Sequence, residues 1–279
     1  MAQDRAVQLN NILWFAVLAF SLSFPVYIAY EQLQTKRFDY HTQTQDPFII
    51  LSFATNAQHP MHRLLKKSST LPIISLGNNQ KWRWHRQKLT AVRNYLRKRH
   101  LQSSNTIILF VDGYDTFFTK NKGNLIETFK MFNKPLVISA EKGCWPRQTP
   151  ACFDPTNNPY PASPSPFRYV NSGTYMGYAW AVYQMLDETL KKHPEQKDDQ
   201  YLLHDYFLNH PGEIALDYHQ KIFSLLFKTT LIDFQFHPET KELTNLITNT
   251  KPFIIHGNGG PAVKAVFLNL YQNYGKAND

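Results

Sequence analysis

Short apolar runs alternate with longer amphipathic stretches along the chain from residue 47 onward. The runs consist mostly of Ile, Leu, Val and Phe, a pattern typical of strands buried in a parallel sheet. They predict strands at 47–53, 71–76, 106–111, 135–140, 222–227 and 253–255. The amphipathic stretches predict helices at 59–67, 82–99, 125–132, 179–192 and 199–208. This alternation predicts an α/β sheet with right-handed crossovers, and the Pro-, Asn- and Ser-rich residues 146–166 predict a long loop.

One apolar run near the N-terminus is much longer than the others. Residues 11–30 form a charge-free run of 20 residues, and a helix of that length spans the roughly 30 Å hydrocarbon layer of a bilayer. Trp14 and Tyr30 lie near its two ends, where aromatic rings favour the membrane interface. We therefore expect a single-pass membrane anchor of open orientation, with a cleaved secretion signal as the alternative. Residues 1–45 are then anchor and linker, and residues 46–279 form one domain.

Composition narrows the possible classes of protein. The 279 residues are 43% hydrophobic, which is enough for a packed core and excludes global disorder. The two cysteines, Cys144 and Cys152, exclude a disulfide-dense scaffold. They can bridge in an oxidising compartment and are free thiols otherwise. The net charge of +9 and the basic segment 81–99 suit an anionic partner, although residues 93–99 are better explained as a solvated helix face. No recognised nucleic-acid-binding module accompanies the charge, so we expect no nucleic-acid partner.

Two acids directly follow the strand predicted at 106–111. Asp112 and Asp115 lie three residues apart in the segment Phe-Val-Asp-Gly-Tyr-Asp, and ligands of α/β sheets bind outside the carboxyl ends of the strands. A divalent cation would keep two converging carboxylates ionised together, and hard oxygen ligands suit Mg²⁺ or Mn²⁺. Tyr114 lies between the acids and offers a flat ring for a base. The alternative is a solvated turn with an aspartate at each end.

A second predicted strand end carries groups that suit the same chemistry. The strand at 253–255 leads into the segment His-Gly-Asn-Gly-Gly, in which His256 can be a third metal ligand. The glycines let backbone N–H groups approach a phosphate closely, and Lys264 can neutralise a diphosphate. The alternative is a glycine-rich turn with an incidental histidine.

Seven groups of short motifs occur in an order that resembles one known family. They lie at 77–81 with 83–84, 110–115, 138–141 with 144–146, 169–173 with 176–178, 198–200, 216–217 with 221–223, and 256–259. On these motifs, residues 48–274 resemble the glycosyltransferase domain of the procollagen-lysine dioxygenase (collagen lysyl hydroxylase) family. The chain is expected to stand alone, without that family's hydroxylase domain.

The resemblance implies a fold and a reaction. The fold is GT-A, in which a mixed, mainly parallel sheet is flanked by helices. The reaction is the metal-dependent transfer of a hexose, glucose or galactose, from a UDP-sugar to a hydroxyl acceptor. Mn²⁺ is the implied metal, with Mg²⁺ as the alternative, and hydroxylysine or galactosyl-hydroxylysine of a collagen-like protein is the implied acceptor. Two other functions stay open, namely a transferase acting on a cell-surface saccharide and a non-catalytic member that binds a glycan or a partner.

Roles for individual residues follow from the same resemblance. The implied metal ligands are Asp112, Asp115 and His256. The donor nucleotide and its diphosphate are assigned to Phe53, Thr55, Lys81, Tyr114, Gly257, Gly259 and Lys264. The sugar and acceptor side is assigned to Trp84, Trp145, Asn171, Asp198 and Asp199. A carboxylate from the pair Asp198–Asp199 can accept the proton of the acceptor hydroxyl, although two acids at a helix start are also what the helix dipole favours.

Overall fold

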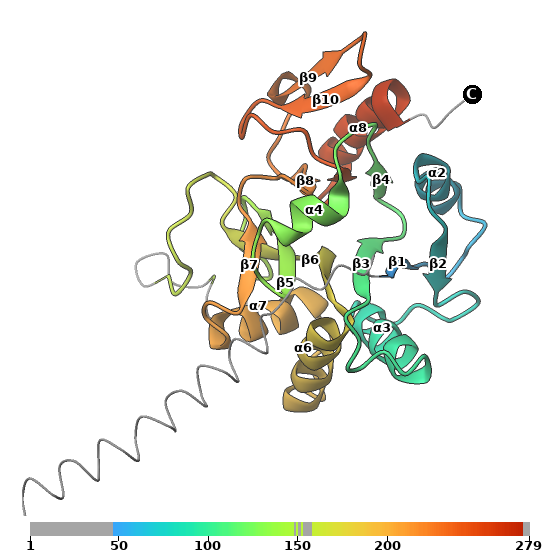
Figure 1. The fold of residues 1–279 in the computed structure, drawn as a ribbon, viewed down its shortest axis with the longest axis vertical. Coiled ribbons are helices and arrows are strands. Elements are labelled where there is room, and N and C mark those ends of the chain that lie inside the picture. Colours follow the sequence, from blue (N-terminus) through green and yellow to red (C-terminus); the bar gives the residue numbers. More distant parts are fainter. Residues whose placement is uncertain (1–46, 148, 150–151, 153–157, 276–279) are drawn as a thin grey trace, which may run out of the picture. The chain divides into compact units, whose positions relative to one another are not determined.

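A six-stranded sheet forms the centre of the structure, a computed structural model that describes residues 47–147, 149, 152 and 158–275 (Figure 1). The strands follow one another across the sheet in the order β2, β1, β3, β6, β5, β7. They comprise β1 (Phe48–Phe53), β2 (Ile73–Leu76), β3 (Ile107–Asp112), β5 (Leu136–Glu141), β6 (Tyr169–Tyr178) and β7 (Ile214–Asp217). The predicted α/β fold class is therefore confirmed.

Strand pairing brings several strand ends to one edge of this sheet. β1, β2 and β3 are parallel, and Phe53 at the end of β1 pairs with Leu76 of β2 and with Asp112 of β3. β6 lies between β3 and β5 and is antiparallel to both, with Thr174 opposite Val111. The first half of β6 therefore lies beside the carboxyl ends of β3 and β5, where ligands of α/β sheets bind.

The long strand β6 is the main difference from the strands predicted above. Its sequence mixes Tyr, Asn, Ser, Gly and Thr and contains no run of aliphatic residues, so the apolar pattern did not reveal it. Nine of its ten residues are nevertheless buried, because β6 is central in the sheet and covered on both faces. The sheet is mixed because of this one strand. The short strands β4, β7, β9 and β10 were also not predicted.

Three helices pack on one another and against the central sheet. They are α3 (Arg86–Lys98), α6 (Ala179–Lys192) and α7 (Asp199–Asn209). Their apolar stripes share one core with the sheet, which includes Leu89, Val92, Leu96, Val182, Met185, Leu202, Phe110 and Tyr175. The bounds of α6 match the predicted helix, whereas α3 begins four residues later than predicted, so the segment 82–85 precedes it.

A second, three-stranded sheet lies beside the first and has its own core. Its order is β4 (Thr116–Phe118), β11 (Ile254–His256) and β8 (Phe223–Leu225). The remaining elements are α2 (Pro60–Ser68), α4 (Leu125–Lys130), η1 (Leu231–Asp233), β9 (Phe234–His237), β10 (Glu242–Asn245), α8 (Pro261–Leu270) and η2 (Tyr271–Gly275). α8 covers this sheet through Phe267, which contacts Phe117 of β4 edge to face with ring centroids 5.2 Å apart.

Cys144 and Cys152 form a disulfide, with their Cα atoms 5.3 Å apart. Of the two states that the sequence left open, the structure therefore has the bridged one.

The predicted membrane anchor at 11–30, together with the linker that follows it, lies outside the described residues. In the described part of the chain, none of the helices is both long enough and apolar enough to cross a bilayer. The division into residues 1–45 and 46–279 stays a prediction.

Candidate active site

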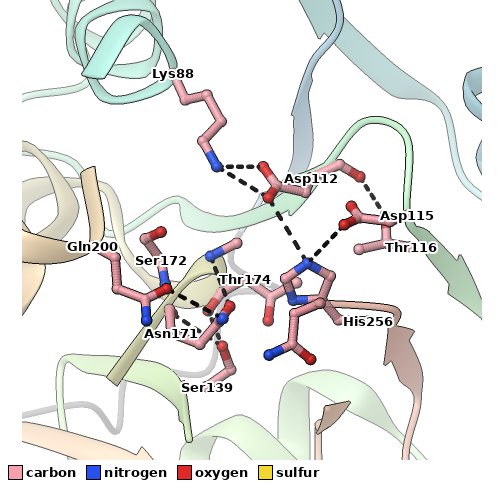
Figure 2. A network of polar contacts seen from close by, with 12 residues as sticks. Lys88, Asp112, Asp115, Thr116, Ser139, Asn171, Ser172, Thr174, Gln200 and His256 are labelled. Carbon is pink, nitrogen blue, oxygen red and sulfur yellow. Dashed lines mark hydrogen bonds and ion pairs between the residues drawn. The ribbon is translucent and has the colours of Figure 1, made fainter. Parts of the chain in front are cut away.

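Three predicted metal ligands converge at the edge where β3, β4 and β11 meet. Asp112 ends β3, Asp115 immediately precedes β4, and His256 ends β11. Because β11 pairs with β4 so that His256 lies opposite Thr116, the imidazole faces both carboxylates (Figure 2). His256 Nε2 lies 3.5 Å from Asp115 Oδ2 and 3.8 Å from Asp112 Oδ2. One ligand atom from each of the three residues lies within 4.8 Å of the other two.

This set of ligand atoms fits a divalent cation. Two carboxylates and one imidazole are suitable donors for Mn²⁺, and carboxylates alone suit Mg²⁺. Gly173 of β6 makes the convergence possible, because a Cβ at this position would overlap the His256 ring and lie 2.8 Å from Asp112 Oδ2. His256 Nδ1 is buried and makes no hydrogen bond to the described residues, so the ring meets its polar partners through Nε2.

The three candidate ligands differ in how their surroundings shift the pKa of each side chain. Burial raises the pKa of Asp112, and the opposing effect of nearby Lys88 does not overcome it. Burial acts in the same direction on Asp115, but the attraction of His256 outweighs it and lowers the pKa of that carboxyl. Burial would lower the pKa of His256, yet Asp115 and Asp112 outweigh it and raise the pKa. The two carboxylates therefore favour a positive charge at the centre.

The candidate metal centre borders a pocket of about 480 Å³, a volume typical of sites for small molecules and cofactors. Six of the seven residues predicted for the nucleotide and diphosphate line it, namely Phe53, Thr55, Tyr114, Gly257, Gly259 and Lys264. The seventh, Lys81, is exposed and does not line the pocket, and its carbonyl accepts a hydrogen bond from Gln87 Nε2 at 3.1 Å. Residues that were not predicted also line it, among them His59, Met61, Trp82, His85, Lys88 and Phe267.

Tyr114 is fixed at one side of this pocket by the segment that follows β1. Its hydroxyl accepts a hydrogen bond from the Asn56 backbone N–H at 2.9 Å and lies 3.2 Å from Thr55 Oγ1. The His59 ring lies beside the Tyr114 ring, with centroids 4.7 Å apart. Gly113 lets this turn approach β1, because a Cβ there would overlap the backbone carbonyl of Phe53.

The glycine segment lies at the other side of the pocket and leads into α8. The Gly257 backbone N–H donates to the Asp115 carbonyl at 2.7 Å, which ties this loop to the candidate metal centre. Gly259 has a φ of +135°, a conformation that L-residues with side chains rarely adopt. α8 begins at Pro261, so its N-terminal N–H groups and Lys264 are near the same loop.

Asp198 and Asp199 lie at the start of α7 but differ in their surroundings. Asp198 caps the helix, because its Oδ1 accepts from the Tyr201 N–H at 2.9 Å. Burial raises the pKa of Asp198. Burial also opposes ionisation of Asp199, but the pairing with Lys88 outweighs it and lowers the pKa. The helix-start interpretation is confirmed for Asp198, and it leaves a role in catalysis open.

None of the five residues predicted for the sugar and acceptor side, Asp198 and Asp199 included, lines the pocket. Trp84 and Trp145 are 48% and 56% exposed. The Trp84 ring has Lys197 Nζ 4.1 Å from its centroid. Asn171 is buried, donates to Glu141 and Gln200, and accepts from the Gly173 N–H at 2.9 Å. Its polar atoms are thus used within the protein.

Sequence reasoning did not assign a role to Glu141, which joins several motifs behind the pocket. Its carboxylate accepts from Asn171 Nδ2 at 3.0 Å, Gln200 Nε2 at 2.7 Å and Asn258 Nδ2 at 2.9 Å. Burial raises the pKa of Glu141 to about 7, against the opposing effect of these donors. Glu141 ends a buried strand within a recognised motif, and that position was the available signal.

Lys88 was also missed, although it contacts Asp112 of the candidate metal centre. Its Nζ donates to both carboxylate oxygens of Asp112 at 2.8 and 3.0 Å and lies 2.8 Å from Asp199 Oδ2. The available signal was the spacing of Lys88 from the apolar residues of the same helix. Lys88 precedes Val92 by four residues and Leu96 by eight, so it belongs to the buried stripe of α3.

Comparison with known proteins gives the family. The family model described as the PLOD GT domain matches residues 44–278. The multifunctional procollagen lysine hydroxylase and glycosyltransferase of Caenorhabditis elegans is 31% identical over 242 residues, which are 80% of this chain and 32% of that protein. A procollagen-lysine,2-oxoglutarate 5-dioxygenase of Drosophila melanogaster is 27% identical over 257 residues, which are 86% of this chain and 34% of that protein. The chain thus spans about a third of the length of these relatives.

Among solved structures, a glycosyltransferase involved in the glycosylation of the major capsid of PBCV-1 is similar with a TM-score of 0.49 and 12% identity. The similarity covers 80% of this chain and 98% of that one. The family match alone covers most of the chain and agrees with the resemblance that the motifs indicate. The chain belongs to the family of the PLOD GT domain, the glycosyltransferase domain of the procollagen lysine hydroxylases.

Proposed function

We propose that residues 46–279 transfer a hexose from a UDP-sugar to a hydroxyl acceptor with a divalent cation held by Asp112, Asp115 and His256. One observation carries the proposal. A convergent pair of carboxylates and an imidazole borders a pocket of about 480 Å³, with Tyr114 at one side and the glycine loop at the other. That order of groups suits a metal-bound diphosphate with a nucleoside at one end. The GT-A fold is part of the same proposal.

Departure of UDP from the sugar builds negative charge on the β-phosphate. When bound, Mn²⁺, or Mg²⁺ as the alternative, supplies Lewis-acid stabilisation of that charge. The chain's own part is to fix its ligands. The strand register holds His256 opposite Thr116, and Gly173 leaves the space in which the ligand atoms meet.

The residues at the sides of the pocket orient the donor. Phe53, Thr55 and Tyr114 would hold the uridine, with the Tyr114 ring positioned by its hydroxyl contacts to Thr55 and Asn56. Gly257 and Gly259 would bring backbone N–H groups to the diphosphate. Lys264 and the N-terminus of α8 add positive charge at the same place. Fixing the donor in this way converts binding energy into correct placement of the reacting bond.

The start of α7 would provide the acid–base group. Asp198 is only partly buried and its pKa is raised, so it is better suited than Asp199 to take the proton of an acceptor hydroxyl. Asp199 is held ionised by Lys88 and is better suited to orient the sugar. Trp84 and Trp145 are exposed and would contact the acceptor. We propose hydroxylysine or galactosyl-hydroxylysine of a collagen-like protein as that acceptor.

We also propose that residues 11–30 anchor the chain in a membrane, with secretion after signal cleavage as the alternative. The Cys144–Cys152 disulfide supports an oxidising compartment for the domain. An extractability assay on the full-length chain in its host cells, with carbonate and then detergent, distinguishes the two.

The function is tested by measuring release of UDP from UDP-glucose and UDP-galactose by the full-length chain. We expect release from at least one donor with Mn²⁺, and its loss with EDTA. GDP-mannose serves as the control donor and should not turn over. Addition of hydroxylysine or galactosyl-hydroxylysine peptides should convert hydrolysis into transfer, detected by mass spectrometry. Absence of both UDP-sugar turnover and UDP-dependent thermal stabilisation would contradict the proposal.

A further inference from the structure

The ammonium of Lys88 lies between two acids, of which Asp112 lines the pocket and Asp199 lies at the start of α7. It contacts both carboxylate oxygens of Asp112 at 2.8 and 3.0 Å and Asp199 Oδ2 at 2.8 Å. Figure 2 shows the Lys88 side chain pointing from its helix toward the Asp112 carboxylate at the candidate metal centre. Asp199 belongs to α7, so three elements distant in sequence meet at one positive charge.

The charge of Lys88 is felt strongly by both acids because all three side chains are withdrawn from solvent. The Lys88 and Asp199 side chains are 8% and 5% exposed, and that of Asp112 is 18% exposed. Solvent and salt screen charges poorly at such depth. One ammonium faces two carboxylates, so a stronger interaction with one acid leaves less for the other.

We propose that Lys88 is a positioning residue that couples the candidate metal centre to Asp199 by sharing one positive charge between Asp112 and Asp199. A divalent cation bound at Asp112 would leave the lysine to pair with Asp199, and would thereby fix that carboxylate at the start of α7. This coupling rests on the proposed function, because it assumes a cation at Asp112. Coupling between two sites is reciprocal, so a change at Asp199 must alter cation affinity.

Packing alone does not account for a charge at this position. Lys88 occupies the buried stripe of α3 with Val92 and Leu96. An apolar residue at 88 would fit the same stripe, but it would leave the carboxylates of Asp112 and Asp199 withdrawn from solvent without their positive partner, which is destabilising. Only a cation at this position pairs with both acids.

The test is a double-mutant cycle read out as Mn²⁺ affinity, measured by isothermal titration calorimetry on the full-length chain. Asp199→Asn should weaken Mn²⁺ binding by about 10-fold, because Lys88 then competes for Asp112 alone. Lys88→Met should leave binding equal to or tighter than that of the wild type, because the competing ammonium is gone. In the Lys88→Met background, Asp199→Asn should change the affinity by less than about 2-fold. Both single variants should turn over UDP-sugar more slowly.

A second lysine–aspartate pair, which also involves α7 but is more exposed, provides the control. Lys192 Nζ lies 2.8 Å from Asp205 Oδ2 between α6 and α7, and neither residue lines the pocket. Asp205→Asn and Lys192→Met should leave the Mn²⁺ affinity and the turnover unchanged. Lys88→Arg keeps the positive charge, so Asp199→Asn should weaken Mn²⁺ binding in that background as it does in the wild type.

Three results would overturn the coupling. One is an unchanged Mn²⁺ affinity in Asp199→Asn, a variant that retains Lys88 and so decides the matter even where Lys88→Met does not fold. Another is an equal effect of Asp199→Asn with and without Lys88. The third is a Lys88→Met variant that binds Mn²⁺ more weakly and melts earlier, which would limit Lys88 to holding the fold. A wild-type chain that turns over UDP-sugar without binding Mn²⁺ or any other divalent cation would instead refute the metal centre itself.

Discussion

The candidate site has two proposed regions, a donor wall and an acceptor wall, that are built from different kinds of structure. The donor wall, which comprises Asp112, Asp115, His256 and the glycine loop, is formed by strand ends whose relative positions are set by sheet register. The acceptor wall, which comprises Trp84, Trp145 and Asp198, does not line the pocket and is formed by the segment before α3, the loop after β5 and the N-cap of α7. His256 is 2% exposed, whereas Trp84 and Trp145 are 48% and 56% exposed.

The difference separates two tasks of a transferase. Backbone pairing fixes the donor wall before any ligand arrives, and charge stabilisation depends on such preorganised groups. The acceptor wall rests on connecting segments, which vary more between relatives and commonly carry specificity. We therefore expect changes in the donor wall to affect the chemical step with every acceptor. Changes in the acceptor wall should affect recognition of one acceptor class.

Loss of one proposed metal ligand is the most severe test of this comparison. Asp115→Asn keeps the size of the side chain but removes a charge that faces His256 at 3.5 Å. We expect kcat for UDP release to fall by about 100- to 1,000-fold, the range seen when a single preorganised stabilising group is lost. Steady-state kinetics with saturating Mn²⁺ would measure the fall, in hydrolysis and in transfer alike.

Asp187→Asn is the control for that substitution, because Asp187 pairs with Lys191 on α6 and does not line the pocket. It should leave both rates unchanged. An Asp115→Asn variant that loses transfer yet keeps hydrolysis would contradict the assignment of Asp115 to the donor wall.

Glu141 lies where the two walls meet, since its three amide partners come from β6, α7 and the loop after β11. Burial raises its pKa to about 7 from the usual 4.5. For an acid shifted upward, the stabilisation is complete below the unfolded-state pKa and is lost as pH rises through the folded-state pKa. The free energy of unfolding should therefore lose about 3 kcal/mol from this group between about pH 4.5 and pH 8.

The measurement is urea unfolding in EDTA across that pH range, for the wild type and Glu141→Gln. Other groups titrate in the same range, such as buried His204, whose pKa burial lowers to about 4. The informative quantity is therefore the free energy of unfolding of the wild type minus that of Glu141→Gln. This signed difference should fall as pH rises, because the stabilisation by protonated Glu141 disappears from the wild type alone. A difference that is constant with pH would show that Glu141 keeps one charge state throughout.

The donor wall could be predicted from sequence largely because its signals are local. Asp112 and Asp115 follow an apolar strand, and His256 follows another, so the rule that ligands bind at strand ends indicated them, and the family resemblance assigned them as metal ligands. That these ends meet depends on register, which sequence spacing does not give. The antiparallel β6, which brings Gly173 between Asp112 and His256, lacks the aliphatic run by which the other central strands were found.

The residues that connect the walls were not predicted, for a different reason. Lys88 lies among seven other basic residues in the segment 81–99, and composition alone makes it indistinguishable from solvated neighbours. Its burial depends on contacts with two acids from other elements, and the local sequence pattern does not reveal such contacts. Asn171 shows the converse, because a polar residue predicted to face the sugar is buried and bonded within the protein.

Removal of the disulfide tests whether the acceptor wall can be perturbed without affecting the donor wall. Replacing Cys144 and Cys152 together by serine opens a loop with a sequence separation of 8 residues. Chain entropy for so short a loop predicts a loss of about 2 to 3 kcal/mol in the free energy of unfolding. Urea unfolding would measure it, with the wild type in reducing buffer as the matched comparison. UDP release without acceptor should be retained below the shifted midpoint, and an equal loss of hydrolysis and transfer would contradict the division into two walls.

Trp145 gives the smallest and most selective expected effect. Its ring is 56% exposed and does not line the pocket, while its backbone is fixed because the carbonyl accepts from Gln200 Nε2 at 2.9 Å. Trp145→Ala therefore removes a contact surface and leaves the scaffold in place. Stacking of this kind is worth about 0.5–1.5 kcal/mol, so KM for a glycosylated acceptor should rise by about 2- to 10-fold, with the KM for UDP-sugar and the hydrolysis rate unchanged. Trp145→Phe keeps an aromatic face and should recover most of the acceptor affinity. If Trp145→Ala instead raised the KM for UDP-sugar, Trp145 would belong to the donor wall, and preorganised strand ends would not be the feature that separates the two.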